Sequence, residues 1–163
     1  MFHQFETTIN SVTAKSSAII MVKLEGHDFP DDMYFHKDHM WVKVEGDKAR
    51  VGYNSWAADA AGKLVSIKTR PAGKKVKAGK TLGSVESGKW VGSLKVPLTG
   101  VIDEINPAIA GNPAIINDAP FGEGWVAIIT PDNLEAELGE LIKGDDKAAL
   151  EAWMKEEVAK AGA

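Results

Sequence analysis

The sequence of 163 residues contains no cysteine. This absence excludes disulfides, thiolate nucleophiles and cysteine-ligated zinc or iron–sulfur sites from the chain. Long apolar runs are missing too, because no stretch approaches the roughly 18 apolar residues that indicate a membrane-spanning helix. The apolar fraction of 44% is nevertheless ordinary, and the length suits one globular domain. We therefore expect a monomeric cytoplasmic protein that does not bind membranes.

Common enzyme motifs are also absent. The sequence contains no glycine-rich nucleotide-binding loop, no paired-histidine zinc motif and no serine-nucleophile motif. His36 and His39 are three residues apart, but they lie just before a predicted strand, where this spacing does not bring two imidazoles to one face. We therefore predict no metal site and no catalytic residue, so the chain is not expected to be an enzyme on its own.

Residues 1–20 are rich in serine and threonine and poor in charge. They lack the basic and apolar segments of a secretory signal and the arginines of a mitochondrial presequence. We predict a disordered leader over residues 1–20 and assign it no function.

The net charge of −4 hides a strongly positive segment. Residues 63–95 hold nine basic side chains and one acidic side chain, a net charge of +8. A nucleic-acid surface usually interleaves aromatic residues or presents a basic helix, and this run does neither. We therefore predict no nucleic-acid binding and interpret the run as a solvated surface or as a docking patch for an acidic partner. Its main cations are Lys63, Lys68, Arg70, Lys74, Lys75, Lys77 and Lys80.

Residues 40–131 are typical of short strands joined by glycine-containing turns. Apolar and polar residues alternate over residues 41–53 around a turn at residues 45–47, which predicts a β-hairpin. Asn54 or Ser55 can cap a short helix that Gly62 then ends. We predict further strands within residues 64–69, 80–86, 91–100, 100–106 and 124–131.

The remaining segments are predicted to be a loop and a helical tail. Residues 106–120 contain three prolines, which predicts a loop with little regular structure. From residue 132 the apolar spacing becomes helical, and one helical face is formed by Leu134, Leu138, Leu141 and Ile142. After a break at residues 144–146, a second helix places on one face Leu150, Trp153, Met154 and Val158. Because strands and helices do not alternate, we predict a mainly β fold rather than a Rossmann-type sheet.

A lysine stands at the most exposed point of the strand pattern. Two predicted strands meet at Glu86, Ser87, Gly88 and Lys89, and comparable strand–turn–strand halves lie on either side of them. Most lysines at hairpin tips only improve solubility, and the chain is then a small docking module with an unmodified Lys89. In a chain without its own nucleophile, metal site or cofactor motif, however, Lys89 is the natural place for a covalently added reactive group.

Four segments in this order resemble the glycine cleavage H-protein family, which are lipoyl-carrier proteins. The resemblance covers roughly residues 33–150. The four segments are HMWVKVEGDKARVGY (39–53), GSVESGK (83–89), PLTGVIDEIN (97–106) and NPAIINDAPFGEGW (112–125). Each segment alone is a weak signal, but the combination is specific.

The resemblance implies a barrel-sandwich hybrid, the fold of lipoyl domains, with a short inner helix and C-terminal helices. It implies an H-protein-like lipoyl domain over residues 21–131 and a helical tail over residues 132–163 that packs on it. It also implies a lipoyl group covalently attached to Lys89, with Glu86, Ser87 and Gly88 forming the tip of the lipoyl hairpin. Biotin is disfavoured, because biotinyl domains flank their lysine with methionines and the neighbours here are Gly88 and Trp90.

Three residues are candidates for the cavity that receives the lipoyl arm. Met40 replaces a family glutamate that helps to hold the loaded amine, Trp56 takes the place of a histidine or aromatic residue, and Trp90 follows the modified lysine. Ser93 also stands where the family has an acidic residue. A cationic amine gains little from such surroundings without a carboxylate, although cation–π contact with Trp56 or Trp90 is available.

These departures lead to two hypotheses about the cargo. We favour a lipoate-binding protein of sulfur oxidation, which resembles H-proteins and serves a heterodisulfide-reductase-like complex. The alternative is a glycine cleavage H-protein that carries the aminomethyl group from glycine decarboxylase to aminomethyltransferase and is reoxidised by dihydrolipoamide dehydrogenase. Either carrier needs a lipoate ligase or a lipoyl transferase, and in either case the chain is a non-catalytic shuttle between the active sites of partner enzymes.

Overall fold

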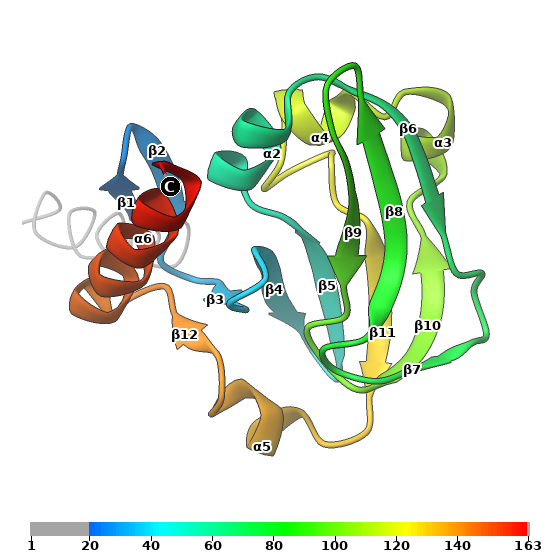
Figure 1. Cartoon of the computed structure of the whole chain (residues 1–163). Helices are drawn as coiled ribbons and strands as arrows, with labels where there is room; N and C mark the ends of the chain where they lie inside the picture. Colours follow the sequence, from blue (N-terminus) through cyan, green and yellow to red (C-terminus); the bar gives the residue numbers. More distant parts are fainter. Residues whose placement is uncertain (1–19, 163) are drawn as a thin grey trace, which may run out of the picture.

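The computed structural model describes residues 20–162 as three antiparallel sheets and five helices (Figure 1). Apart from Ile20, the predicted leader over residues 1–20 lies outside the described residues. Strand makes up more of the described chain than helix, and the mainly β prediction is confirmed. No helix within residues 20–162 is long and apolar enough to cross a membrane.

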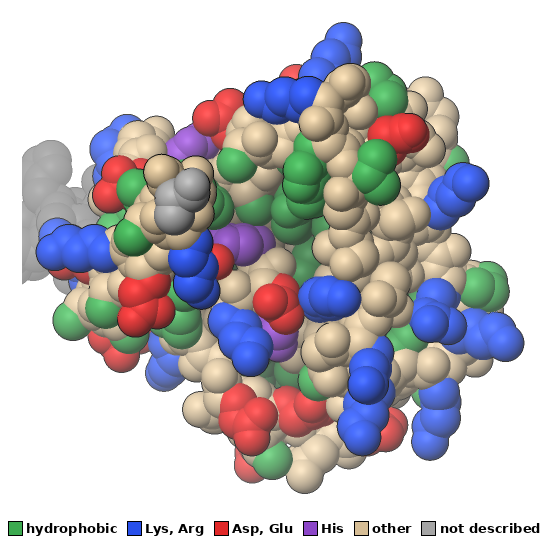
Figure 2. All heavy atoms as spheres, viewed as in Figure 1, with side chains coloured by type: hydrophobic (Ala, Val, Ile, Leu, Met, Phe, Trp, Pro, Cys, Tyr) green, Lys and Arg blue, Asp and Glu red, His purple; other side chains and the backbone are tan. Residues whose placement is uncertain are grey.

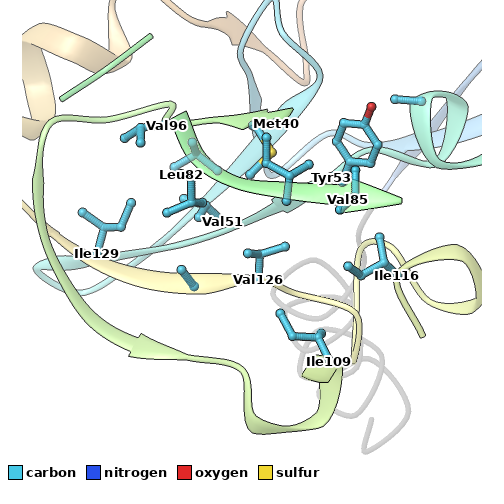
Figure 3. Packing of buried hydrophobic residues seen from close by; sticks show 14 of the residues in the cluster. Met40, Val51, Tyr53, Leu82, Val85, Val96, Ile109, Ile116, Val126 and Ile129 are labelled. Carbon is cyan, nitrogen blue, oxygen red and sulfur yellow. The ribbon is translucent and has the colours of Figure 1, made fainter. Parts of the chain in front are cut away.

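Two sheets pack face to face and enclose the main core. The larger sheet has the strand order β12 (Ile142–Lys143), β3 (Tyr34–Phe35), β4 (Met40–Glu45), β5 (Lys48–Tyr53), β11 (Ala127–Pro131), β10 (Gly100–Ile105), β7 (Lys75–Val76). The smaller sheet has the order β6 (Leu64–Thr69), β8 (Thr81–Ser87), β9 (Val91–Lys95). Alternate residues of both sheets point inward, and Figure 3 shows Val51 and Ile129 of the larger sheet packed with Leu82 and Val85 of the smaller one.

A second core lies where the C-terminal helix packs on the outer side of the larger sheet. Helix α6 (Lys147–Gly162) covers the hairpin formed by β1 (Met21–Leu24) and β2 (His27–Pro30). Its buried residues Leu150, Trp153 and Met154 join Phe29, Phe35 and Trp41 in one cluster. The predicted second helix is therefore confirmed, and three residues of its predicted face are buried, while Val158 is only partly buried.

The central predictions from local pattern are confirmed as well. Strands β4 and β5 form the predicted hairpin. Helix α2 (Ser55–Ala61) is capped by Asn54, whose side chain accepts a hydrogen bond from the Ala57 N–H at 2.9 Å. Gly62 ends this helix with φ of +86°.

The prediction of a loop over residues 106–120 was wrong. This segment forms α3 (Pro107–Gly111) and α4 (Ile115–Asp118). Asn106 caps α3 by accepting the Ala108 N–H at 3.0 Å, and Pro107 occupies the first turn, where its missing N–H costs nothing. Pro107 therefore starts a helical turn here instead of preventing one.

The predicted helix over residues 134–142 is shorter than expected. Helix α5 (Leu134–Leu138) ends after five residues, and Ile142 lies in β12, where it pairs with Phe35. Pairing at the edge of the larger sheet outweighs the helical spacing of the leucines. Strands β1 and β2 were not predicted, although their turn at Glu25 and Gly26, both with positive φ, is typical of a tight hairpin.

Candidate functional site

Lys89 lies at the tip of the hairpin formed by β8 and β9, and its side chain is exposed. The Ser87 N–H donates to the Trp90 carbonyl at 2.8 Å, so only Gly88 and Lys89 form the turn. A two-residue turn between paired strands holds the backbone of Lys89 firmly, while its side chain stays free in solvent. The predicted tip residues therefore come together as expected from the sequence.

Ser87 anchors this tip to helix α2. Its side chain is buried, and its hydroxyl donates to the Ala61 carbonyl at 2.6 Å. The same oxygen lies 3.3 Å from the Lys89 N–H, which donates to it. Ser87 thus positions the root of the lysine, whereas Glu86, which also precedes Lys89, is exposed on the outer face of the sheet.

The lysine stem passes over Gly62 at the end of α2. A Cβ atom built on Gly62 would lie 2.9 Å from Cε of Lys89. With φ of +86° and ψ of 178°, Gly62 also occupies a backbone region that is essentially restricted to glycine. Glycine at this position therefore serves both the end of the helix and the path of the lysine.

Asn117 of α4 supports the same region, and the sequence analysis missed it. Its amide nitrogen donates to the carbonyls of Ala58 at 3.0 Å and Gly62 at 2.9 Å, and its amide oxygen accepts from the Leu64 N–H at 2.9 Å. The end of α2 and the start of β6 are thereby joined through one side chain. The available signal was an asparagine among apolar residues, since buried asparagines commonly bind backbone groups.

A cavity of about 180 Å³ lies beside the root of Lys89. Figure 2 shows the hydrophobic and histidine side chains in the hollow between α6 and the β8–β9 hairpin. Trp56 and Trp90 line the cavity, whereas Met40 is fully buried in the main core and does not line it. The complete lining is His39, Tyr53, Trp56, Ala57, Ala60, Ala61 and Trp90.

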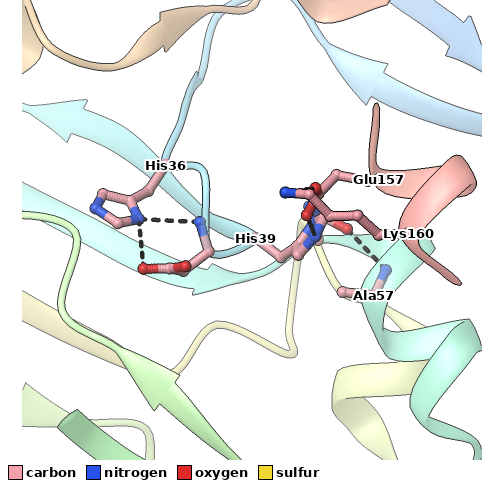
Figure 4. A network of polar contacts seen from close by, with 7 residues as sticks. His36, His39, Ala57, Glu157 and Lys160 are labelled. Carbon is pink, nitrogen blue, oxygen red and sulfur yellow. Dashed lines mark hydrogen bonds and ion pairs between the residues drawn. The ribbon is translucent and has the colours of Figure 1, made fainter. Parts of the chain in front are cut away.

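His39 is fixed in one orientation by both ring nitrogens (Figure 4). Nε2 lies 2.6 Å from Oε1 of Glu157, and Nδ1 lies 3.1 Å from Nδ2 of Asn54. Because the oxygen of Asn54 accepts the Ala57 N–H, its amide nitrogen must donate to Nδ1, so the proton of His39 resides on Nε2. Burial lowers the pKa of His39 despite the neighbouring carboxylate, which keeps the imidazole neutral.

Two tryptophans enclose the same imidazole. The ring of Trp56 lies 5.0 Å from that of His39, and the ring of Trp153 is stacked at 5.1 Å. Trp153 belongs to α6, so the C-terminal helix supports a wall of the cavity. The His39 ring therefore packs between Trp56 of α2 and Trp153 of α6.

Glu157 brings a carboxylate close to the cavity that the sequence analysis did not consider. Burial acts to raise its pKa, but hydrogen bonds from Lys160 and His39 outweigh burial and lower the pKa, so the group is ionised. The Lys160 ammonium lies 2.9 Å from its other oxygen. A detectable signal was its position four residues after Trp153, on the helical face that packs against the domain.

A metal site and a second cavity were also considered as candidate sites, and neither is supported. Within residues 20–162 no three His, Asp or Glu side chains cluster in a way that could hold a metal ion. A larger cavity of about 360 Å³ is lined by Glu137 and Glu140, but none of residues 86–90 lines it. Glu137 is already engaged there, because it accepts the Thr99 N–H at 2.8 Å.

Comparisons with known proteins agree with this arrangement. The family model for the glycine cleavage H-protein matches residues 33–156. "Glycine cleavage system H protein 5" of Aquifex aeolicus is 38% identical over 135 residues, which cover 80% of this chain and 91% of that protein. The "Glycine cleavage system H protein" of Geobacillus thermodenitrificans is 35% identical over 121 residues, covering 74% of this chain and 94% of that protein.

A solved structure is similar as well. The crystal structure of a glycine cleavage system H protein from Mycobacterium marinum superimposes with a TM-score of 0.67 at 35% identity, covering 75% of this chain and 98% of that one. The predicted barrel-sandwich fold is thereby confirmed. The names of these relatives support the glycine cleavage alternative better than the sulfur-oxidation hypothesis.

The residues present also fit the group that the family carries. A lipoyl group needs an exposed amine on a firm base, with apolar surface within reach for the dithiolane end, and the hairpin tip beside the aromatic cavity provides both. The chain therefore belongs to the glycine cleavage H-protein family, whose members are non-catalytic carriers with lipoate attached covalently to a lysine.

Proposed function

We propose that Lys89 bears the lipoyl group and that the protein carries the aminomethyl group from glycine decarboxylase to aminomethyltransferase. Dihydrolipoamide dehydrogenase then reoxidises the carrier, and a lipoate ligase or lipoyl transferase loads it. The observation that carries the proposal is the exposed Lys89 on a two-residue turn, in a chain of the H-protein family. We place this monomeric carrier in the cytoplasm.

When bound, lipoate supplies a reducible cyclic disulfide whose opening accepts the one-carbon unit. The chain itself supplies the firm base of the arm. Ser87 ties the hairpin tip to Ala61, and Asn117 ties the end of α2 to β6. Because the base is rigid, the conformational freedom is confined to the lipoyl-lysine side chain. Each transfer then becomes effectively intramolecular once a partner has docked.

The cavity between α2 and the hairpin is the proposed resting place of the arm. Its lining contains four aromatic rings, of His39, Tyr53, Trp56 and Trp90, and no carboxylate. Burial raises the pKa of Tyr53 to about 12, so its hydroxyl is uncharged at neutral pH. Aromatic faces can retain an ammonium by cation–π attraction as well as an apolar dithiolane. Trp56 and Trp90 are the arm-binding residues in this proposal, while Met40 shapes the core beneath them.

We also propose a functional division of the chain. Residues 21–131 form the lipoyl domain, and residues 132–163 form a tail whose helix α6 braces the cavity through Trp153 and Glu157. Residues 1–20 take no part.

The test is exchange of labelled bicarbonate into glycine by purified glycine decarboxylase. Lipoylated protein is expected to support exchange, and the Lys89→Arg variant, which keeps the charge but cannot be lipoylated, is expected to support none. Fully lipoylated protein that gives no exchange above that variant would overturn the proposal.

A second candidate function rests on one observation. No carboxylate lines the cavity, which favours an uncharged cargo. The second candidate is therefore a carrier of sulfur oxidation, with a heterodisulfide-reductase-like complex as its partner. Capture experiments with lipoylated protein distinguish the two, since either that complex or glycine decarboxylase is retained.

A further inference from the structure

The positive segment of the chain forms an exposed surface along the smaller sheet and β7. The seven cations of residues 63–80 all have exposed side chains: Lys63, Lys68, Arg70, Lys74, Lys75, Lys77 and Lys80. Figure 2 shows Lys and Arg gathered along the side formed by the smaller sheet and β7, away from α6. Lys63 lies near the tip, because the next residue, Leu64, pairs with Ser87, whereas Lys68 and Arg70 lie farther along β6, toward the end of the hairpin opposite Lys89.

No carboxylate within residues 20–162 neutralises these cations. None of the seven forms an ion pair there, whereas Lys23, Lys48, Lys147 and Lys160 elsewhere each contact an Asp or Glu. Seven unpaired like charges repel one another, which weakens the folded state slightly. A surface of this kind gains most when a partner of opposite charge covers it.

Serines occupy part of the outer face of the smaller sheet. Strand pairing sets Lys68 opposite Ser84 and Ser84 opposite Ser93, and both serines are exposed. Next to them Glu86 pairs with Ser66 and Val91. These short side chains leave room between the longer ones for close approach by another protein.

A shallow hollow on this face has two cations among its lining residues. It has a volume of about 250 Å³, and Lys68 and Arg70 are its two cations. Thr69, Thr81 and Ser84 are also among its lining residues. Arg70 is held in place because its Nε–H donates to the Thr81 carbonyl at 2.8 Å. Two cations at one hollow match the charge of a carboxylate.

Apolar side chains surround the lysine root. Among the described residues, five large hydrophobic side chains are exposed, and three of them, Val65, Trp90 and Val91, lie at this end of the smaller sheet. Val65 is 61% exposed and Val91 is 70% exposed, on the strands at either side of Glu86. Apolar contacts at the centre and charges at the rim are the usual anatomy of a protein–protein interface.

We propose that this outer face, formed by Val65, Lys68, Arg70, Ser84 and Val91, docks an acidic surface of the enzyme that receives the arm. A carboxylate of the partner occupies the hollow between Lys68 and Arg70. Val65 and Val91 pack against the partner around the entrance that admits the lipoyl group, and the other cations steer the approach. The inference rests on the proposed function, which names glycine decarboxylase as that partner.

The test measures KM of glycine decarboxylase for fully lipoylated carrier as a function of salt. The proposal predicts that the double variant K68E/R70E raises this KM about tenfold at low salt, with kcat nearly unchanged. The matched control is K143E/K155E, which makes the same charge change at two exposed lysines of β12 and α6 that form no ion pair within the described chain. The control is expected to leave KM within about twofold. Intact mass confirms equal lipoylation of every carrier.

Further outcomes separate the possible failures. Wild-type carrier without exchange at any salt contradicts the proposed function, whereas exchange with a KM indifferent to salt and to K68E/R70E overturns only the docking face. An equal rise in KM for both double variants also overturns it, since the effect would then reflect net charge. Strong binding of a single-stranded oligonucleotide that K68E/R70E abolishes, with KM unaffected, would assign the face to nucleic acid instead.

Discussion

The smaller sheet and helix α6 flank the same cavity but are built in opposite ways. The sheet presents small outer side chains, unpaired cations and exposed valines. Helix α6 buries Leu150, Trp153 and Met154, and its lysines Lys147 and Lys160 pair with its own glutamates. One side is therefore built to meet other molecules and the other to hold the fold together.

The two sides meet at Trp56. This residue packs against the main core and also against the second core, and its ring contacts His39. Changes in α6 are therefore expected to reach the cavity through Trp56 and His39, while changes on the outer face of the sheet are not.

The largest expected effect is at Lys89. Lys89→Arg is expected to abolish lipoylation, because the guanidinium does not replace the amine in amide formation, while the fold is unchanged at this exposed position. Intact mass spectrometry after incubation with a lipoate ligase measures loading, and circular dichroism checks the fold. Loading of the arginine variant would show that another lysine is modified.

The next largest effect is expected in the second core. Trp153→Ala removes a buried ring that contacts Phe29 and Phe35 at centroid distances of 6.4 Å and stacks on His39. We expect a loss of about 3–5 kcal/mol in the free energy of unfolding, measured by urea denaturation. No hydrogen bond is lost, because its indole N–H has no partner among the described residues.

The matched change on the sheet is Val65→Ala. Val65 is 61% exposed, so the free energy of unfolding should change by no more than about 0.5 kcal/mol. Similar losses at Trp153 and Val65 would contradict the division between the two sides.

A smaller effect is expected at Gly62. Gly62→Ala places a side chain in a backbone region that favours glycine and at 2.9 Å from Cε of Lys89, so we expect a loss of about 1–3 kcal/mol. Gly46→Ala is the control, because Gly46 also has positive φ but no atom within 4 Å of its Cβ position. We expect slower lipoylation of Lys89 for Gly62→Ala and an unchanged rate for Gly46→Ala. Equal rates of lipoylation in the two variants would show that Gly62 does not affect the path of the lysine side chain.

The smallest expected effect is a pH dependence at the contact of α6. The folded pKa of His39 is lowered, so unfolded His39 takes up a proton at a pH where the folded residue stays neutral. Stability from this contact is therefore complete above the ordinary pKa of 6.5 and is lost as pH falls below it. The lowered pKa of Glu157 acts in the same direction below 4.5.

The variant His39→Asn tests whether His39 causes this loss of stability at low pH. Asparagine is chosen because it tolerates the positive φ of +72° at this position. Urea denaturation at a series of pH values should give a weaker fall in stability below pH 6.5 for this variant than for wild type. A steeper fall in the variant would contradict the assignment of a neutral imidazole.

Local pattern was sufficient for much of the fold. The β4–β5 hairpin, helix α2 with its Asn54 cap and Gly62 end, and the β8–β9 turn all depend on neighbours in sequence. Their turns and caps are governed by short-range hydrogen bonding, which residue type reports well. The position of Lys89 followed from the same kind of signal.

Features set by distant contacts were not predictable in this way. Ile142 has a helical pattern but pairs with Phe35, more than a hundred residues away. Met40 follows His39 in the chain, yet the pleat of β4 sends it into the core. Asn117 and Glu157 act on residues 53 to 118 positions distant, so only the folded chain reveals their roles.

The most direct test of the central claim is the mass of the Lys89 peptide after one turnover. Lipoylated protein is incubated with glycine decarboxylase and isotope-labelled glycine, quenched, digested and measured. The account predicts that the labelled one-carbon unit appears on the lipoylated peptide that contains Lys89 and on no other peptide. A fully lipoylated Lys89 peptide that gains no label, beside a known H-protein that does, would contradict the account.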